Sequence, residues 1–411
     1  MYLWLKILTI VYLVSIAISL LYYFFISLNH KEVLNDAYLL KVDREPFVSI
    51  ILPTLNEENN IEKCLQSLRS QNYSNFEIIL SDGGSKDKTV KLAKKYVDKI
   101  IIKDDTPDEW IGKNYGCHLG YEQAQGEILL FTDADTVHAP DALRIFVSKL
   151  LEKRAGLVTV FPYQNLRRWW ESIVPIYFFL SHLTSGGLKK VNDPRENDSF
   201  LGIGQYLLFT REAYEEIGGH LRLKGSIIED YAFARIVKKE LQALFYTPSD
   251  KLVRAQMYPE SFRHCWTGFK KVLYAGTKLT PPRRITITLL FCLATIFSPV
   301  MITLIAIYQT PHSFWLLTMV IGYVFIILAF AFYWNNKGRH FWVTYFFFPF
   351  LMLFFIFTLI ASTLEILISK TTTWKGRKYK PDLRAGLNDF ENKKEEDFPA
   401  SAPKVKLKSN Q

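Results

Sequence analysis

The chain has 411 residues, of which 49% are apolar and 15% aromatic, and its formal net charge is +10 at pH 7. This length allows one or two domains. The four cysteines have no paired spacing, so neither a disulfide framework nor a zinc site is indicated. No nucleic-acid-binding motif accompanies the basic charge, so we expect no nucleic acid partner.

Long apolar runs lie towards both ends of the chain. Leu3–Leu28 is long enough to cross a bilayer, too long for a signal peptide, and not followed by a small-residue cleavage site. We therefore expect residues 1–28 to be a retained transmembrane anchor. Three further runs, Ile285–Tyr308, Phe314–Trp334 and Phe341–Ile368, predict a C-terminal membrane region at residues 285–368. A soluble domain at residues 29–284 separates the two regions.

Basic side chains set the expected orientation of these segments. Five of them precede the run at Ile285, whereas the loop at residues 309–313 carries none, which favours a multi-pass protein of the cell membrane with a cytoplasmic domain. Three full crossings after the domain would place the basic tail, residues 369–411, outside, against the same tendency. Because Phe341–Ile368 contains Pro349, a re-entrant or interfacial segment is the open alternative. Beyond Lys380 the tail is rich in charge, Pro and Ser, and we expect it to be partly disordered.

The first half of the soluble domain alternates between strand and helix patterns. Strands are predicted at Phe47–Pro53, Glu77–Leu80, Lys99–Lys103 and Ile128–Thr132, with a helix after each of the first three. The first helix has Asn56 as its expected N-cap, and the third covers Tyr115–Gln125. This alternation predicts an α/β fold with a doubly wound sheet, whose ligands bind at the carboxyl ends of the strands.

Two carboxylates, Asp133 and Asp135, come directly after the fourth predicted strand. Two acidic side chains one residue apart at a strand end can both reach one hard divalent cation. Such a cation would neutralise the phosphates of a nucleotide-activated group and help the diphosphate to leave. An exposed turn or a helix cap is the alternative use of this short pattern.

Two more loops carry candidate ligand-binding groups. Asp82 ends the second predicted strand and is followed by Gly83 and Gly84, so it could accept hydrogen bonds from a base or ribose, or belong to a plain Asp/Gly turn. Lys113 could contact a diphosphate as a point charge, or be solvated beside an acidic loop.

Three stretches resemble the family 2 glycosyltransferases of the GT-A fold: Val48–Glu58, Asp82–Asp87 and Gly126–Asp135, in this order and spacing. The resemblance implies a Rossmann-like nucleotide-diphospho-sugar transferase domain. It assigns Pro53, Thr54, Glu57 and Asp82 to the nucleotide pocket. It also implies that Asp133 and Asp135 hold the diphosphate of a nucleotide sugar, with UDP-hexose expected, through Mg²⁺ or Mn²⁺.

The resemblance continues on the acceptor side of the site. Gly202–Gln205 and the pair Glu229-Asp230 are similar to family stretches in which the Asp of the acidic pair is the general base. A carboxylate at hydrogen-bonding distance from an acceptor hydroxyl can remove its proton as the hydroxyl attacks. Capping of a helix by the two acids is the alternative reading of this pair.

One stretch departs from the family pattern. Processive members carry Gln-x-x-Arg-Trp after the acidic pair, but here the sequence is Phe262-Arg-His-Cys-Trp266. Trp266 is kept as a candidate substrate-binding residue, whereas the Gln and Arg are lost. This counts against a processive polysaccharide synthase and leaves the roles of Arg263 and His264 open.

The membrane segments point to a lipid acceptor. Basic and Trp residues at 167–170, followed by Ile173–Leu180, predict an interfacial segment near residues 169–188, with a buried core helix as the alternative. The likeness to known proteins is carried by the spans, by Trp110–Lys113, by the Arg263–Trp266 region and by Trp374–Tyr379. Together these resemble membrane-bound carotenoid-acid glycosyltransferases, and they are similar to ceramide and hopanoid glycosyltransferases. We expect an inverting transferase acting on a membrane lipid. The rivals are a polyprenyl-phosphate sugar synthase and a catalytically silent membrane scaffold with the same fold.

Overall fold

The structure is a computed structural model that describes residues 7, 9–14, 17, 45–308, 314–335, 337–339, 341, 344–345, 347–374, 377–383 and 385. Most of the expected anchor at residues 1–28 and the tail beyond residue 385 lie outside these residues. Of the N-terminal segment, residues 9–14 are helical, and the Tyr12 hydroxyl forms a hydrogen bond with Ser298 Oγ.

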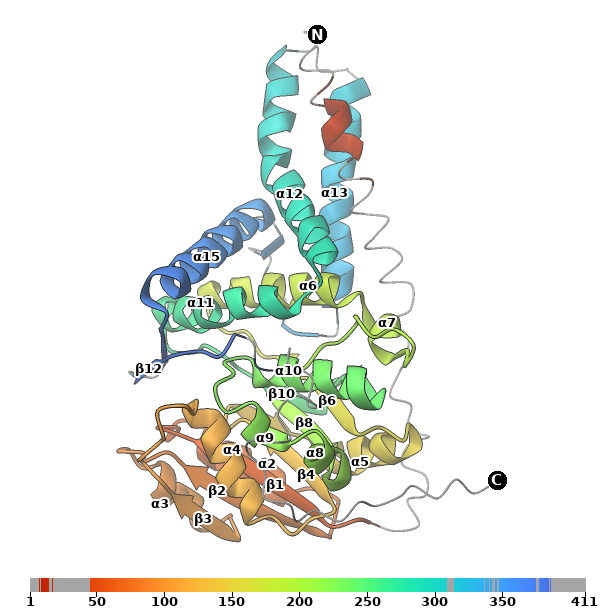
Figure 1. The fold of residues 1–411 in the computed structure, drawn as a ribbon. Coiled ribbons are helices and arrows are strands. Elements are labelled where there is room, and N and C mark those ends of the chain that lie inside the picture. Colours follow the sequence, from red (N-terminus) through yellow and green to blue (C-terminus); the bar gives the residue numbers. More distant parts are fainter. Residues whose placement is uncertain are drawn as a thin grey trace.

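A seven-stranded mixed sheet forms the centre of the soluble domain, with strand order β3-β2-β1-β4-β8-β6-β9 (Figure 1). The strands are β1 (Val48–Thr54), β2 (Phe76–Asp82), β3 (Lys99–Ile102), β4 (Ile128–Thr132), β6 (Leu157–Phe161), β8 (Tyr206–Thr210) and β9 (Leu244–Pro248). Only β8 runs antiparallel to its neighbours, β4 and β6, within this sheet. The first four strands confirm the predicted ones to within a few residues.

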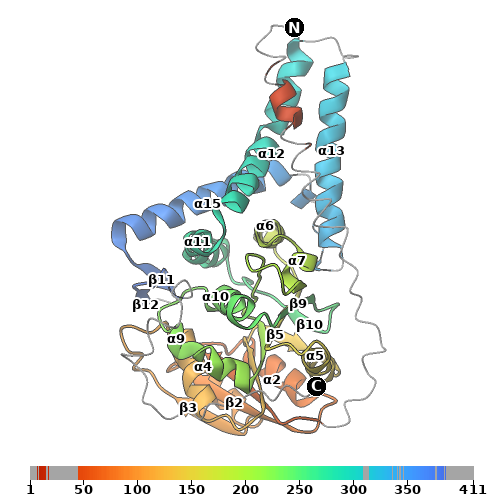
Figure 2. The same cartoon turned by 45° about the vertical axis from the view of Figure 1, so that its right-hand side comes forward.

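Helices cover both faces of the sheet because successive residues of each strand point to opposite faces. In β1, Ile50 and Leu52 pack into the core with α2 (Ile61–Arg69), α3 (Thr89–Ala93) and α5 (Ala142–Glu152), whereas Ile51 packs into the other core. That second core includes α4 (Gly112–Glu122), α8 (Arg211–Glu216) and α10 (Glu229–Ile236), with α9 (Gly219–Arg222) beside α4. The doubly wound arrangement is therefore confirmed (Figure 2).

Two predicted helix starts were wrong. Helix α2 begins at Ile61 rather than after Asn56, because Asn56 adopts a positive φ of 53° and its side chain accepts a hydrogen bond from the amide of Lys86 instead (2.9 Å). Helix α4 begins at Gly112, three residues earlier than predicted. Lys113 consequently lies in the first turn of a helix rather than in an acidic loop.

A layer of helices separates the sheet from the long apolar helices (Figure 1). It contains η2 (Trp169–Ile173), α6 (Val174–Ser185) and α11 (Phe262–Leu279). Most of α6 is buried, including Phe178 and Phe179, whereas Trp169 is 66% exposed. The buried-helix alternative thus describes α6, and only the start of the segment presents an aromatic side chain at the surface.

Three C-terminal helices are long and apolar enough to cross a membrane: α12 (Pro282–Tyr308), α13 (Phe314–Trp334) and α15 (Phe348–Ser369). The third begins seven residues later than the apolar run that predicted it. The four cysteines are buried and free, as their spacing indicated.

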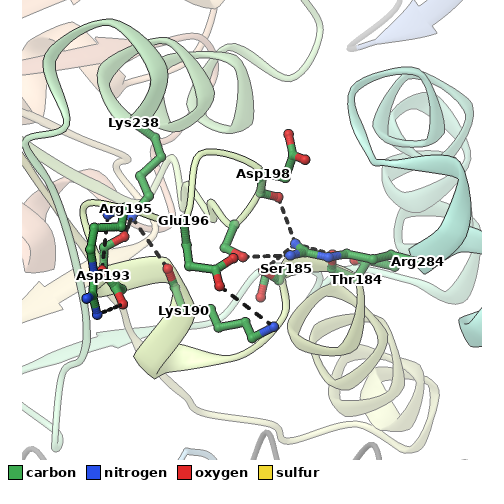
Figure 3. Close-up of polar contacts among 10 residues, drawn as sticks. Thr184, Ser185, Lys190, Asp193, Arg195, Glu196, Asp198, Lys238 and Arg284 are labelled. Atoms are coloured by element: carbon green, nitrogen blue, oxygen red, sulfur yellow. Dashed lines mark hydrogen bonds and ion pairs between the residues drawn. The ribbon is translucent and has the colours of Figure 1, made fainter.

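Arg284, in the first turn of α12, ties this helix to the soluble domain (Figure 3). Its buried guanidinium donates hydrogen bonds to the carbonyl oxygens of Ser185 and Asp198, both at 2.7 Å, and to Ser199 Oγ at 2.6 Å. The buried Lys238 ammonium donates to the carbonyl oxygens of Val191 and Asp193, and Figure 3 shows Lys238 beside Asp193. These two cations fix residues 185–199, the segment that leads to the Gly202–Gln205 stretch.

Part of the basic tail is ordered, which the sequence did not predict. Strands β11 (Thr372–Trp374) and β12 (Arg377–Tyr379) pair with each other. The Arg377 guanidinium donates to Thr106 Oγ1 (3.2 Å) and to the carbonyl oxygen of Gly83 (3.3 Å). The tail therefore lies against the loops at the carboxyl ends of the strands.

Candidate active site

The carboxyl ends of β1, β2 and β4 form the edge at which the predicted site residues gather. Strand pairing sets Pro53 opposite Ser81 and Thr54 opposite Asp82, and β4 runs parallel on the other side of β1. Parallel neighbours end at one edge of a sheet, so Asp133, just after β4, lies at the same edge. The structure thus brings the first, second and third motifs together.

Lys113 joins the donor-side carboxylate to the acidic pair of α10. Its ammonium lies 2.8 Å from Asp133 Oδ1 and 3.0 Å from Glu229 Oε1. Burial disfavours the charge, but the two carboxylates outweigh it and raise the pKa of Lys113 well above its ordinary value. Lys113 is therefore a charged group held between two acids that are 96 residues apart in the sequence.

Asp135 has an environment that fits a cation ligand. Its Oδ1 is buried without a hydrogen-bond partner, and its Oδ2 accepts only a long bond from Gln205 Nε2 (3.4 Å). Burial, followed by the charges of Asp133 and Glu57, raises the pKa of Asp135 to about 8. An unpaired buried carboxylate oxygen beside a second carboxylate is a costly arrangement that a bound cation would relieve.

Asp230 is held in place by backbone amides. Its Oδ2 accepts from the amide of Gly204 (2.7 Å) and its Oδ1 from its neighbour Tyr231 (2.8 Å). Burial, and then the charge of Glu229, raises the pKa of Asp230 to about 6. A Cβ at residue 202 would lie 1.9 Å from the carbonyl oxygen of Asp230, so only glycine allows this close approach.

A cavity of about 260 Å³ adjoins these groups. Its charged lining residues are Lys113, Asp133, Glu229, Asp230 and Lys271. The rest of its wall is largely apolar and comes from residues 201–205, 227–231 and 257–258 and from α6, α11, α12 and α15, including Phe269, Leu289, Phe355 and Leu359. One cavity therefore extends from the strand edge to helices that are apolar enough to cross a membrane.

Asp82 is saturated by neighbours within its own loop. Its two oxygens accept from the amides of Gly84 and Ser85, from Ser85 Oγ and from Thr54 Oγ1, at 2.6–3.0 Å. A carboxylate has about four acceptor positions, so a bond from a base or ribose would have to displace one of these donors. In this structure Asp82 shapes the nucleotide-side loop, and Thr54 is one of its partners.

Three residues near the lost Gln-x-x-Arg-Trp pattern lie outside the cavity wall: Arg263, His264 and Trp266. Trp266 stacks on Phe357 of α15, with ring centroids 6.4 Å apart, and His264 Nδ1 lies 3.3 Å from Glu260. Pro53, Thr54, Glu57 and Asp82, which the family resemblance assigned to a nucleotide pocket, also do not line this cavity.

The sequence did not single out Lys271 and Gly276 of α11 as site residues. Lys271 counted only as one of the basic residues before a membrane run, yet it lines the cavity, and burial lowers its pKa to about 8. The signal available in the sequence was the spacing of Phe269, Val272 and Gly276, which places these residues on one helix face.

Residues 49–218 match the family model described as glycosyl transferase family 2. Residues 49–218 therefore form a family 2 glycosyltransferase domain within the GT-A-like α/β fold, and the protein is a glycosyltransferase. The expected family resemblance is confirmed.

The similar proteins include two curated relatives and one solved structure. The 4,4'-diaponeurosporenoate glycosyltransferase of Staphylococcus aureus strain USA300 is 27% identical over 335 residues, which cover 81% of this chain and 88% of the relative. The protein of the same name from strain bovine RF122 / ET3-1 is 26% identical over the same length. The structure of mannosyltransferase PcManGT from Pyrobaculum calidifontis in complex with GDP-Man and Mn²⁺ superposes with a TM-score of 0.55 at 18% identity, covering 89% of this chain and 99% of that one. At this identity the structural likeness concerns the fold alone.

Proposed function

We propose that this protein is an inverting glycosyltransferase that moves a sugar from a nucleotide-sugar donor to a lipid acceptor in the membrane. The observation that carries the proposal is the single cavity lined at one end by Lys113, Asp133 and Asp230 and at the other by apolar residues of α12 and α15. A water-soluble acceptor would not need the apolar end.

On the donor side, Asp133 and Asp135 would hold Mg²⁺ or Mn²⁺ together with the donor diphosphate. The described residues contain no group of three His, Cys, Asp or Glu side chains that could hold a metal ion, so oxygens of the donor would complete the coordination. The cation would supply charge neutralisation for the leaving nucleoside diphosphate. Lys113, already charged between Asp133 and Glu229, would add a hydrogen-bond donor for the same diphosphate.

On the acceptor side, an oxygen of the acceptor would attack the anomeric carbon of the sugar. The bond from that carbon to the diphosphate oxygen breaks as the new glycosidic or ester bond forms, with inversion at the carbon. For a hydroxyl acceptor, Asp230 would take the proton. Its fixed position, with amides of Gly204 and Tyr231 on its two oxygens, suits this role.

The curated relatives support a terpenoid carboxylic acid as one acceptor class, because their name specifies a carotenoid acid. A carboxylate or a lipid phosphate is already ionised at neutral pH and would need no base. The same site would then work through positioning, the cation and Lys113, without a general base. We further propose that the domain lies on the cytoplasmic side, where nucleotide sugars are found, in agreement with the basic residues that precede α12.

The donor half is tested with the full-length protein in lipid nanodiscs, using UDP-glucose and GDP-mannose. We expect nucleoside diphosphate release that requires Mn²⁺ or Mg²⁺ and falls by about 100-fold or more in Asp133→Ala. Asp108→Ala, an exposed acid of a neighbouring loop, is the matched control. Equal release by Asp133→Ala and wild type would refute the assignment of the metal site.

The acceptor half is tested by mass spectrometry of lipids from cells with and without the protein. A new hexosyl-lipid supports the proposal, and the mass of its head group separates a carboxylic acid or alcohol from a polyprenyl phosphate. Loss of that product in Asp230→Asn, with donor release retained, would place the base at Asp230. Donor release and lipid composition that are both unaffected by the protein would favour the silent scaffold.

A further inference from the structure

Gly276 lies on the cavity wall, in the last two turns of α11. A Cβ built at this position meets no atom within 4 Å, and its backbone is helical without a positive φ. Glycine within a helix is destabilising relative to alanine. Neither backbone conformation nor packing therefore explains why residue 276 has no side chain.

The other glycine of the same helix gives a clear contrast. A Cβ at Gly268 would lie 2.4 Å from the Tyr258 ring, so close packing requires glycine there. At Gly276 the missing side chain leaves open volume on the side of α11 that faces the cavity. The volume belongs to the same cavity that Asp230 lines.

The surroundings of this open volume are largely apolar. Leu289 of α12 and Phe355 and Leu359 of α15 line the same cavity. The hydroxyl of Thr280, one turn beyond Gly276, is engaged by the Gly276 carbonyl oxygen (2.8 Å) and by the Tyr231 hydroxyl (3.2 Å). The polar lining residues in this part of the chain are Lys271, Thr277, Thr280 and Thr288, and among the described residues the buried Thr288 hydroxyl has no hydrogen-bond partner. The other lining residues of α12 and α15 are apolar, so a hydrocarbon chain fits this wall.

On α12 and α15, residues that line the cavity are directly followed in the sequence by residues exposed on the outer surface of these helices. Leu289 lines the cavity while Leu290 is 53% exposed, and Leu359 lines it while Ile360 is 52% exposed. Exposed large apolar side chains on helices of this length face lipid. A hydrocarbon chain in the cavity would therefore have its head at the charged end and its tail directed to the bilayer.

Contacts that α11, α12 and α15 make fix the positions of the helices that line this part of the cavity. Lys270 of α11 pairs with Glu365 of α15 at 2.9 Å, and the amide of Tyr274 donates to Ser362 Oγ at 3.1 Å. Arg284 fixes the start of α12. The space beside Gly276 is thus bounded by anchored elements, and a side chain added there would narrow it.

We propose that the space beside Gly276 is the subsite for the hydrocarbon tail of the acceptor lipid, and that the bare glycine sets the width of the tail the enzyme accepts. This inference rests on the proposed function. It assigns acceptor selectivity to a residue that has no part in the chemistry of transfer.

The test measures transfer from the donor that the wild type hydrolyses to two pairs of acceptors: hexanoic against hexadecanoic acid, and hexanol against hexadecanol. The wild type should prefer the long member of at least one pair. Gly276→Phe should lower the ratio of kcat/KM for long over short acceptor by about 10-fold or more, mainly through KM, because the added ring fills volume that the long hydrocarbon tail would occupy. Gly276→Ala should give a smaller decrease, and Lys278→Phe, an exposed position on the same helix, should keep the wild-type ratio.

A second variant guards against misfolding of Gly276→Phe. Leu359→Trp fills the cavity from α15 and should lower the same ratio. A wild type without preference for long chains, variants that keep the preference, or no transfer to any of the four acceptors despite intact donor hydrolysis would each overturn the subsite. Absence of donor hydrolysis in the wild type would instead overturn the proposed function.

Discussion

Asp135 has a buried carboxylate oxygen without a hydrogen-bond partner, and its pKa is raised. Both features have the same cause. The side chain is enclosed and faces the charges of Asp133 and Glu57, so its anion is poorly stabilised without a cation. With its pKa raised to about 8, the metal-free carboxyl group is mostly protonated at pH 7. A divalent cation would displace that proton.

This leads to a prediction for Asp135→Asn, which resembles the protonated acid. At pH 7 and without metal, the variant should unfold at or above the wild-type temperature. Mn²⁺ with UDP or GDP should raise the unfolding temperature of the wild type, because ligands that bind only the folded state stabilise it, and should not raise that of the variant. Asp108→Asn is the control and should keep the shift. A normal Mn²⁺ shift in Asp135→Asn would show that Asp135 is not a ligand.

Asp230 predicts a pH dependence whose form depends on the acceptor. Burial and the charge of Glu229 raise the pKa of Asp230 to about 6, against the opposing effects of Lys113 and the amides of Tyr231 and Gly204. The base is active when ionised, so transfer to a hydroxyl acceptor should fall about tenfold per pH unit below pH 6 and level off above it.

Asp230→Asn should abolish the change in transfer rate near pH 6, and it should also remove most of the transfer activity to a hydroxyl acceptor. Transfer to a carboxylate acceptor, which is ionised already, should stay flat from pH 6 to 8 because no base is needed. Initial rates with saturating donor at each pH provide the measurement. A hydroxyl acceptor with a flat profile down to pH 5 would argue against Asp230 as the base.

At the scale of single elements, α12 depends on one buried cation. Arg284→Met should leave the carbonyl oxygens of Ser185 and Asp198 without donors and lower the free energy of unfolding by at least about 2 kcal/mol. Thermal unfolding of the full chain in detergent measures the loss. Arg283→Met is the matched control, because Arg283 is the exposed neighbour in the same turn. A loss of equal size in both variants would mean that charge near the membrane, not the buried network, is responsible.

The sequence predicted the elements whose signal is local. Strands β1, β2 and β4 are short, apolar and followed by polar loops, so their positions and the acids at their ends could be recognised directly. Strands β6, β8 and β9 have similar composition, but β8 inserts antiparallel between β4 and β6, and that order arises from tertiary pairing. The sequence likewise gave no sign that Arg377 contacts Thr106, 271 residues away.

The site residues divide in the same way, into those with a local signal in the sequence and those without one. Asp133, Lys113, Glu229 and Asp230 were recognised by residue type and motif, and the structure brings all four to one cavity. Gly276 could not be recognised, because a glycine that leaves space is indistinguishable in sequence from one required by packing, such as Gly268. Position 266 holds the Trp of the family pattern, yet this side chain packs on α15.

At the scale of the whole molecule, α12 and α13 form a helix pair. The start of α12 and the chain just after the end of α13 both contact the soluble domain. Arg284 at the start of α12 bonds to Ser185, and after the end of α13 the amide of Arg339 donates to the carbonyl oxygen of Gln164 (2.9 Å). The two helices stand side by side, away from the sheet (Figure 1). We therefore propose that this hairpin, whose two helices are long and apolar enough to cross a membrane, crosses the bilayer twice.

Helix α15 also has both ends on the domain side. Its first residue, Phe348, packs near Phe179 of α6, with ring centroids 6.4 Å apart. After its last turn the chain forms β11 and β12, and Arg377 contacts Gly83 of the soluble domain. A helix that crossed the membrane fully would deliver the tail to the opposite side. The contacts therefore favour the re-entrant or interfacial alternative for α15, which also resolves the conflict between three crossings and the basic tail.

Cysteine labelling in intact cells tests this topology, with a membrane-impermeant maleimide and single cysteines at three positions. Gln309→Cys, between α12 and α13, should react from outside. Lys94→Cys, on the surface of the soluble domain, should react only after the membrane is permeabilised. Lys380→Cys, after α15, should behave in the same way, because the two crossings by α12 and α13 return the chain to the side of the soluble domain. The native cysteines are buried and should contribute little background. Labelling of Lys380→Cys from outside would mean that α15 spans the bilayer, and the contact between Arg377 and Gly83 could not then form in the membrane-bound protein.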